Sequence, residues 1–178
     1  MIKMLFQKCI HKINYYLVRR DPVKLARFLG VNFPEDGLHI YGDVAWNTEP
    51  WIITLGKNVH ITNGVRFLTH DGGTLLFRDS EPDLEVTKPI VVGDNVYIGN
   101  NVLLMPGICV GNNVVIGAGA VVTKDIPDNV VVGGVPARVI ESLEQYHLKL
   151  QRSSLHVGHL TGKKKDDALK AIYGYKRD

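Results

Sequence analysis

A six-residue pattern of apolar and polar positions runs through residues 92–126. The first and fifth positions of each hexad are apolar, the second is mostly glycine, and the third and fourth are turn-forming residues such as Asn-Asn or Pro-Gly. The first positions are Val92, Ile98, Leu104, Val110, Ile116 and Val122. The fifth positions are Val96, Val102, Ile108, Val114, Ala120 and Ile126. This spacing predicts a short strand and a tight turn in every hexad, because Gly, Asn and Asp tolerate the positive φ angles of sharp turns.

Repeated strands of this kind predict an all-β solenoid. A single hexad cannot bury its own apolar pair, so stacked coils about 4.8 Å apart have to supply the core. A row of antiparallel hairpins with Asn-rich turns is the alternative. Six consecutive hexads in one register favour the solenoid.

The hexads continue towards the N-terminus with less regularity. Residues 38–51 fit poorly because Trp46 and Pro50 interrupt the rhythm, whereas residues 55–71 follow it more closely. We expect the first coil of the solenoid to start in the first of these two segments.

One hexad fails in a way that predicts a loop. Its fifth position, apolar elsewhere, is Asp71, with His70 just before it, and the next hexad begins only at Val92. Residues 73–91 are therefore expected to project from the coil. They carry three adjacent apolar residues followed by four carboxylates. Long loops in compact repeat folds are usually functional, and the apolar residues favour packing on a further surface, such as another subunit, over a disordered excursion.

Helices are expected before the first coil, in residues 1–37. An apolar face with lysines elsewhere predicts a basic amphipathic helix at residues 2–18, which would pack on the protein itself or a neighbouring subunit, or dock on an anionic membrane surface. A second helix is expected to start after Asp21, a suitable N-cap before Pro22, and to end at Gly30. This second helix would cover the open end of the solenoid.

The predicted solenoid domain, residues 38–139, is followed by a helical extension, residues 140–178. Apolar residues at helical spacing predict helices at 140–152 and 166–173. The polar stretch between them holds three consecutive lysines. These lysines form either a phosphate-binding site or, as we favour, a solvated basic surface.

Composition narrows the class of protein. The 178 residues are enough for one domain with a real core, and the formal net charge of +3 gives no case for nucleic-acid binding. Two cysteines are too few for a disulfide framework, so a reducing compartment is expected. No uninterrupted apolar run is long enough for a signal peptide or a membrane span. We expect a cytoplasmic protein, located at the inner face of the membrane if the N-terminal helix docks there.

The hexads, the segment GAGAVVTKDI at 117–126 and the segment GVPARVI at 134–140 together resemble the hexapeptide-repeat acyltransferases. The segment THDGG at 69–73 most resembles the sugar-modifying members, which include galactoside, maltose and polysaccharide O-acetyltransferases. The resemblance covers roughly residues 38–141, and the motifs are specific when they are read jointly.

The resemblance implies a fold, a donor, an acceptor and an assembly. The fold is a left-handed parallel β-helix with three hexads per coil, whose handedness rests on the resemblance alone because left-handed crossovers run against the usual rule. The donor is acetyl-CoA, and no metal is expected. The acceptor is a carbohydrate hydroxyl of a surface polysaccharide or its precursor. The assembly is a homotrimer with active sites between subunits.

The resemblance also implies a catalytic base. In this family a histidine at a coil corner takes the proton of the acceptor hydroxyl, whose oxygen attacks the thioester directly, and His70 matches that position. Histidine titrates near neutrality and can accept a proton within hydrogen-bond reach. Asp71, Glu81 and Asp83 are candidates for holding its second nitrogen.

Acceptor-binding residues transfer from the family less well. Galactoside-type relatives bind the sugar with polar residues one coil before the histidine. Asn47 and Glu49 are the nearest matches to them in this sequence, although the spacing departs from that pattern. Asp71, which follows His70 in the sequence, and Glu81, on the projecting loop, are further candidates for acceptor contact.

Residues that match coenzyme A contacts lie in the later coils. They are Gly99, Asn100, Ala118, Thr123, Lys124 and Arg138. The alanine would contact the pantetheine arm, where small residues permit close approach, and the threonine and lysine would follow along it. The arginine would lie near the adenosine phosphates. The backbone of the glycine and asparagine is expected near the thioester, as an oxyanion donor.

Three other functions stay open. An N-acetyltransferase of an amino sugar would use the same base and donor on an amine. A β-helix zinc carbonic anhydrase would need three histidine ligands gathered between coils, whereas His60 and His70 are expected at different corners. A catalytically silent scaffold would tolerate loss of the histidine or of the Thr-Lys pair, and both are present.

Overall fold

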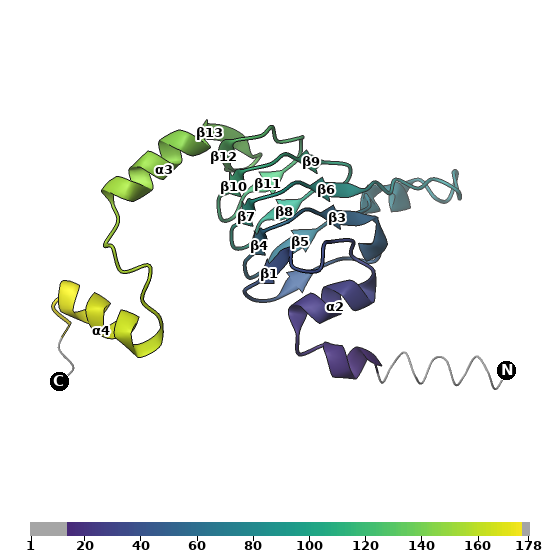
Figure 1. Ribbon diagram of the computed structural model, residues 1–178. Coiled ribbons are helices and arrows are strands. Elements are labelled where there is room, and N and C mark those ends of the chain that lie inside the picture. Colours follow the sequence, from purple (N-terminus) through teal and green to yellow (C-terminus); the bar gives the residue numbers. More distant parts are fainter. Residues whose placement is uncertain (1–13, 176–178) are drawn as a thin grey trace. The chain divides into compact units, whose positions relative to one another are not determined.

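Three sheets form the solenoid of the protein, whose computed structural model describes residues 14–175 (Figure 1). The first sheet contains, in spatial order, β1 (Leu38–Ile40), β4 (Val59–Ile61), β7 (Val96–Ile98), β10 (Val114–Ile116), β12 (Val130–Gly133) and β13 (Arg138–Ser142). The second contains β2 (Val44–Ala45), β5 (Val65–Phe67), β8 (Leu103–Leu104) and β11 (Val121–Val122). The third contains β3 (Ile53–Leu55), β6 (Ile90–Val92) and β9 (Cys109–Val110).

The chain visits the three sheets in turn. After β1, β2 and β3 it returns to place β4 beside β1, β5 beside β2 and β6 beside β3, and these pairs are all parallel. The later strands repeat the order, so the chain forms stacked coils with one hexad on each side. The prediction of parallel coils rather than antiparallel hairpins is therefore confirmed.

The predicted apolar positions form the core. All twelve first and fifth positions of hexads 92–126 are buried, with exposed fractions of 0 to 6%. The residue between them faces outwards, as Tyr97 does between Val96 and Ile98. Because burial of one such aliphatic side chain contributes about 1.5–3 kcal/mol, the stacked pairs supply most of the drive for coiling.

Asparagines make the turns at one corner of the coils. Asn58, Asn95, Asn113 and Asn129 all have positive φ angles, between 55° and 61°. Their side-chain amides form a ladder along the stack, with N–O distances of 3.0, 3.1 and 2.9 Å. Asparagine suits this position for two reasons, since it tolerates the left-handed turn and hydrogen-bonds to the next coil.

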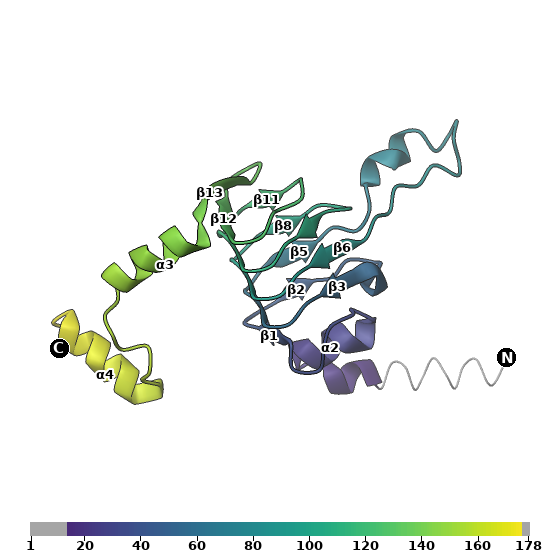
Figure 2. The ribbon, with the colours of Figure 1, turned by 45° about the horizontal axis from the view of Figure 1, so that its top comes forward.

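The strand register shows where residues have been inserted into the repeat. A regular coil advances by three hexads, as from Val96 to its partner Val114, whereas the interval from Ile53 to its partner Ile90 is more than twice as long. The excess projects between β5 and β6, as predicted (Figure 2). The predicted end of this loop at residue 91 is wrong, because Ile90 is a buried core residue and begins β6.

The first coil is longer than the regular ones. Val44 pairs with Val65, whereas an advance of three hexads would pair it with Thr62, so this coil contains three extra residues. They accommodate Trp46, which is buried and stacked on Phe67, and a 3₁₀ helix, η1, at Pro50–Ile52. The two residues that break the hexad rhythm therefore mark a real change in the path of the chain.

Helix α2 (Pro22–Leu29) follows the predicted signals. The side chain of Asp21 accepts hydrogen bonds from the backbone of Val23 and Lys24, and Gly30 ends the helix with a φ angle of 98°. Ala26 packs into the solenoid core. The helix predicted at 2–18 lies mostly outside the described residues, although 14–18 are helical.

The C-terminal part differs from the prediction at its start. Residues 138–142 form β13, which pairs antiparallel with β12, so the helix predicted from residue 140 begins only with α3 (Leu143–Arg152). Helix α4 (Gly162–Ile172) also starts earlier than predicted. The compact units are Met1–Leu143 and Glu144–Asp178, and the second contains most of α3 and all of α4. Within residues 14–175, no helix has the length and apolarity needed to cross a membrane.

Candidate functional site

His70 lies at the coil corner between the second and third sheets, where the projecting loop leaves the solenoid. Its backbone forms an antiparallel bridge with Thr87, on the returning end of the loop. On either side of this bridge the Asp71 nitrogen donates to the Val86 oxygen and the Lys88 nitrogen donates to the Thr69 oxygen. The two ends of the loop therefore hold each other and fix the main chain of the histidine.

Glu49, from the same corner of the preceding coil, contacts the imidazole of His70. Its Oε2 lies 2.9 Å from His70 Nδ1 and accepts a hydrogen bond of 2.6 Å from the buried hydroxyl of Thr69. Its Oε1 accepts a hydrogen bond of 2.5 Å from the hydroxyl of Thr48. The carboxylate is thus held through both oxygens.

These contacts decide the charge of the Glu49 carboxyl and the tautomer of the imidazole. Hydrogen bonds from Thr48, Thr69 and His70 lower the pKa of Glu49 to about 2, so the carboxylate is charged at neutral pH. A charged carboxylate accepts hydrogen bonds and does not donate them, so Nδ1 of His70 carries the proton. The neutral imidazole then presents Nε2, which has no hydrogen-bond partner among the described residues, as a proton acceptor.

The three carboxylates considered from sequence as partners of His70 lie elsewhere. Oδ1 of Asp71 accepts from the backbone of Gly73 and caps a short 3₁₀ helix, η2, at Gly72–Leu76. Glu81 and Asp83 are exposed further along the loop. Glu49, considered from sequence as an acceptor contact, instead takes the position beside the imidazole.

Two hollows meet at His70. One, which we call the loop hollow, has a volume of about 180 Å³ and is lined by Glu49, His70, Asp71, Gly72, Thr74, Leu75, Arg78 and Glu85. The other, which we call the coil hollow, has a volume of about 390 Å³ and is lined by Asn47, Leu68, His70, Asp71, Gly72, Met105 and Pro106. The histidine is thus accessible from both hollows, and Glu49, Arg78 and Glu85 line the loop hollow but not the coil hollow.

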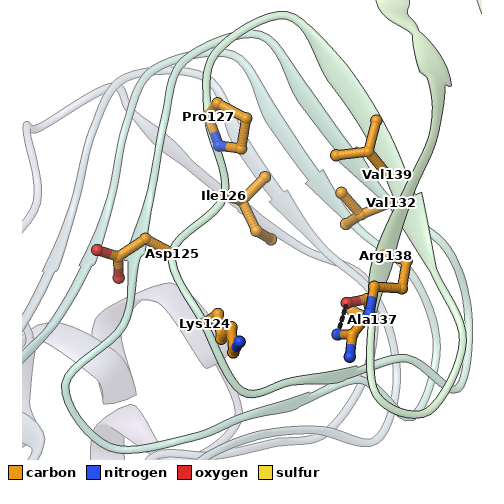
Figure 3. Close-up of a pocket in the computed structure, with 8 residues that line it drawn as sticks. All are labelled: Lys124, Asp125, Ile126, Pro127, Val132, Ala137, Arg138 and Val139. Carbon is orange, nitrogen blue, oxygen red and sulfur yellow. Dashed lines mark hydrogen bonds between the residues drawn. The ribbon is translucent and has the colours of Figure 1, made fainter.

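A third cleft lies at the far end of the solenoid and contains two of the predicted coenzyme A contacts. It has a volume of about 290 Å³, and Figure 3 shows Lys124 and Arg138 on opposite sides of its opening, with Asp125 pointing away. Lys124 occupies the same coil corner as His70, two coils further on, which corresponds to about 10 Å along the stack. Thr123 is exposed beside it.

The other predicted coenzyme A contacts occupy a different corner, between the first and second sheets. Gly99 packs so closely that a Cβ atom there would lie 2.6 Å from the backbone nitrogen of Ala118. Oδ1 of Asn100 accepts a hydrogen bond from the Asn63 nitrogen. Within one chain, the predicted contacts are therefore divided between two corners.

Sequence reasoning missed four polar residues of this site, Thr48, Thr69, Arg78 and Glu85. It also missed the pairing of Glu49 with His70, because a regular coil of three hexads would place Ile52 beneath the histidine. The signal was the broken rhythm between residues 46 and 50, which lengthens the first coil by three residues.

The remaining histidines of the solenoid do not join this site. His39 and His60 stack on the outer face of the first sheet, with ring centroids 4.5 Å apart. His60 Nδ1 lies 2.9 Å from the hydroxyl of Tyr41, and burial, then the neighbouring His39, lowers the pKa of His60. Within residues 14–175, no group of three or more His, Cys, Asp or Glu side chains is arranged to hold a metal.

Comparisons with known proteins agree with this architecture. The family model for the bacterial transferase hexapeptide (six repeats) matches residues 89–124. Protein CapG of Staphylococcus aureus is 44% identical over 125 residues, which span 70% of this chain and 73% of CapG.

Two solved structures are similar over most of the chain. The maltose O-acetyltransferase from Clostridium difficile 630 has a TM-score of 0.53 and 28% identity, over 77% of this chain and 84% of that one. The hexapeptide-repeat acetyltransferase VCA0836 from Vibrio cholerae, solved in complex with acetyl coenzyme A, has a TM-score of 0.52 and 26% identity, over 69% of this chain and 78% of that one. From its coils and these likenesses, the chain belongs to the hexapeptide-repeat acetyltransferase family.

Proposed function

We propose that the protein transfers an acetyl group from acetyl-CoA directly to a carbohydrate hydroxyl, with His70 as the general base. The acceptor would be a surface polysaccharide or its precursor. The observation that carries this proposal is the pairing of His70 Nδ1 with the charged carboxylate of Glu49 at 2.9 Å, on the wall shared by two hollows. A base placed between two binding spaces can serve a reaction that joins two substrates.

The proposed reaction uses the two nitrogens of the imidazole differently. Nε2 takes the proton of the acceptor hydroxyl while the oxygen attacks the thioester carbonyl, and the imidazolium then returns the proton to the leaving thiolate. Glu49 keeps Nδ1 protonated and stabilises the positive charge that develops on the ring. General-base assistance of this kind contributes about 10²–10⁴-fold, and alignment of the two substrates supplies much of the remainder.

The two hollows suit different substrates. We assign the acceptor sugar to the loop hollow, because its carboxylates and guanidinium can hydrogen-bond to hydroxyl groups. We assign the acetyl thioester end of the donor to the coil hollow, because Leu68, Met105 and Pro106 give it an apolar wall. Asn47 lies in the coil hollow, so its proposed contact is with the reacting centre rather than with the distal part of the sugar.

The third cleft, at the far end of the solenoid, fits the phosphates of coenzyme A. Lys124 and Arg138 face each other across its opening, and ammonium and guanidinium groups are the usual partners of phosphate. The bound acetyl coenzyme A of the Vibrio cholerae relative supports this donor. The sugar-modifying activity in the name of the maltose O-acetyltransferase supports the acceptor class.

We infer a left-handed β-helix that works as a homotrimer. The handedness follows the family. The assembly explains why the predicted donor contacts lie at two corners, around Ala118 and around Lys124, because one extended donor can contact both when corners of two subunits face each other. Sedimentation should give a trimer, and an active monomer would contradict this part of the proposal.

An acceptor screen tests the proposed function. Purified protein is mixed with acetyl-CoA and a panel of mono- and oligosaccharides and amino sugars, and release of free thiol is followed. We expect turnover with hydroxyl acceptors that lack an amine. Turnover only with amino sugars would support N-acetylation instead, and absence of turnover on the whole panel would contradict carbohydrate transfer.

A further inference from the structure

The loop hollow beside His70 contains more carboxylates than cations. Its lining contains three carboxylates, Glu49, Asp71 and Glu85, and one guanidinium, Arg78. The pKa of Glu49 is lowered to about 2 by its hydrogen bonds, so this carboxylate stays charged when a substrate arrives at neutral pH. A negatively charged group entering the hollow therefore meets a net negative lining.

The single cation of this hollow is already engaged by the protein. Nη2 of Arg78 lies 2.5 Å from Oε2 of Glu85, and its Nε donates to the backbone oxygen of Leu84. Oε1 of Glu85 in turn accepts a hydrogen bond of 2.6 Å from Thr87, whose backbone bridges to His70. The carboxylate that neutralises Arg78 is thus positioned by the same returning segment that positions the catalytic base.

Asp71 has a carboxylate oxygen that can accept a hydrogen bond from the substrate, and it forms no ion pair with a described residue of the protein. Its Oδ1 caps η2 through Gly73, and Oδ2 has no hydrogen-bond partner among residues 14–175. A free carboxylate oxygen at the wall of a hollow accepts hydrogen bonds from hydroxyl or ammonium groups and repels other carboxylates.

We propose that this site selects an acceptor sugar without negative charge, that is, a neutral or amino sugar, and that Glu85 excludes hexuronic acids by keeping Arg78 occupied. The inference rests on the proposed sugar acetylation and specifies its substrate class. One unit charge about 6 Å away changes binding by about tenfold at an effective dielectric constant of about 40. Discrimination of at least tenfold against an acidic sugar is therefore expected.

The test compares a 4-nitrophenyl hexoside with the corresponding hexuronide, with acetyl-CoA as donor and free thiol as readout. For the unmodified protein, kcat/KM should be at least tenfold higher for the hexoside. Glu85→Gln removes the countercharge and frees Arg78, so the ratio should fall by about tenfold or more. Asp79→Asn removes one carboxylate of the same loop that does not line the hollow, and it should leave the ratio unchanged.

The outcomes separate the inference from the function on which it rests. Turnover that favours the hexuronide, or an unchanged ratio in Glu85→Gln, overturns the charge selection while leaving sugar acetylation in place. Absence of turnover with either glycoside contradicts the proposed function itself. If Glu85→Gln fails to fold, the unmodified protein still decides the question. The hexuronide should inhibit acetylation of the hexoside with a Ki at least tenfold above the KM of the hexoside, and a Ki similar to that KM overturns the inference.

Discussion

Replacement of Glu49 by glutamine isolates the role of its charge. Glutamine keeps the length and shape of the side chain and can still accept from Thr69 and from His70 Nδ1 through its carbonyl oxygen. It lacks the negative charge, and it can instead turn its amide towards the imidazole and favour the wrong tautomer. We therefore expect a loss of catalysis without a comparable loss of structure.

The size of the loss follows from the geometry of the pair. As His70 takes up a proton, it becomes a cation next to Glu49, with 33% of the histidine side chain and 24% of the glutamate side chain exposed. Two unit charges 4 Å apart attract by about 1 kcal/mol in bulk water and by about 4 kcal/mol at an effective dielectric constant of 20. Partial exposure places the pair between these limits, so kcat should fall by about fivefold to a thousandfold.

The assay is steady-state acetyl transfer, with free-thiol release as the readout, together with urea unfolding of both proteins. Glu49→Gln should bind CoA as the unmodified protein does and remain folded under the assay conditions. Glu49→Asp keeps the charge on a shorter arm and should lose less activity than Glu49→Ala. A kcat for Glu49→Gln equal to that of the unmodified protein, with the same pH profile, would contradict the role given to the charge of Glu49.

Two further predictions concern stability. Thr69→Val keeps the shape of the buried side chain but removes a hydrogen bond to the charged Glu49, so the free energy of unfolding should fall by about 1.5–3 kcal/mol at pH 7, whereas Thr69→Ser should retain most of the bond. Because the pKa of Glu49 is lowered from its ordinary value of 4.5 to about 2, its contribution is complete above pH 4.5 and is lost as the pH falls towards 2. Acid titrations of stability should show a shallower decline over that window for the valine variant, and identical curves would contradict the role given to Thr69. Asn113→Ala should cost about 2 kcal/mol or more, through two ladder hydrogen bonds and a strained left-handed turn, and Asn113→Gly should recover about 1 kcal/mol of this in urea unfolding.

The regular part of the fold was predictable because one physical cause determines it. An apolar pair at the first and fifth positions of each hexad can be buried only if the coils stack, so the sequence period determines both the strand positions and the core. The loop was predictable for the same reason, since an interruption of a strict period is visible as an excess of residues. Its end was misplaced because Ile90 lies outside the hexads counted from Val92, although it forms the buried start of β6.

The pairing of Glu49 with His70 was not predictable from the period. Glu49 reaches His70 because the first coil is longer than three hexads, and its extra residues are taken up by the packing of Trp46 and by η1. The same limit applies to β13, because its antiparallel pairing with β12 is a tertiary contact of residues whose spacing also fits a helix. Where an irregular segment contacts a regular one, the local pattern no longer determines which side chains meet.

The most direct test of the proposed mechanism is the turnover of His70→Ala, measured by free-thiol release with an acceptor identified in the screen. Its affinity for CoA is measured beside it by calorimetry. Removal of the imidazole should lower kcat by about 10²–10⁴-fold and leave the folded state unchanged. CoA binding should also be unchanged, because Lys124 and Arg138 lie at least two coils away from His70. Turnover close to that of the unmodified protein would contradict the assignment of His70 as the general base.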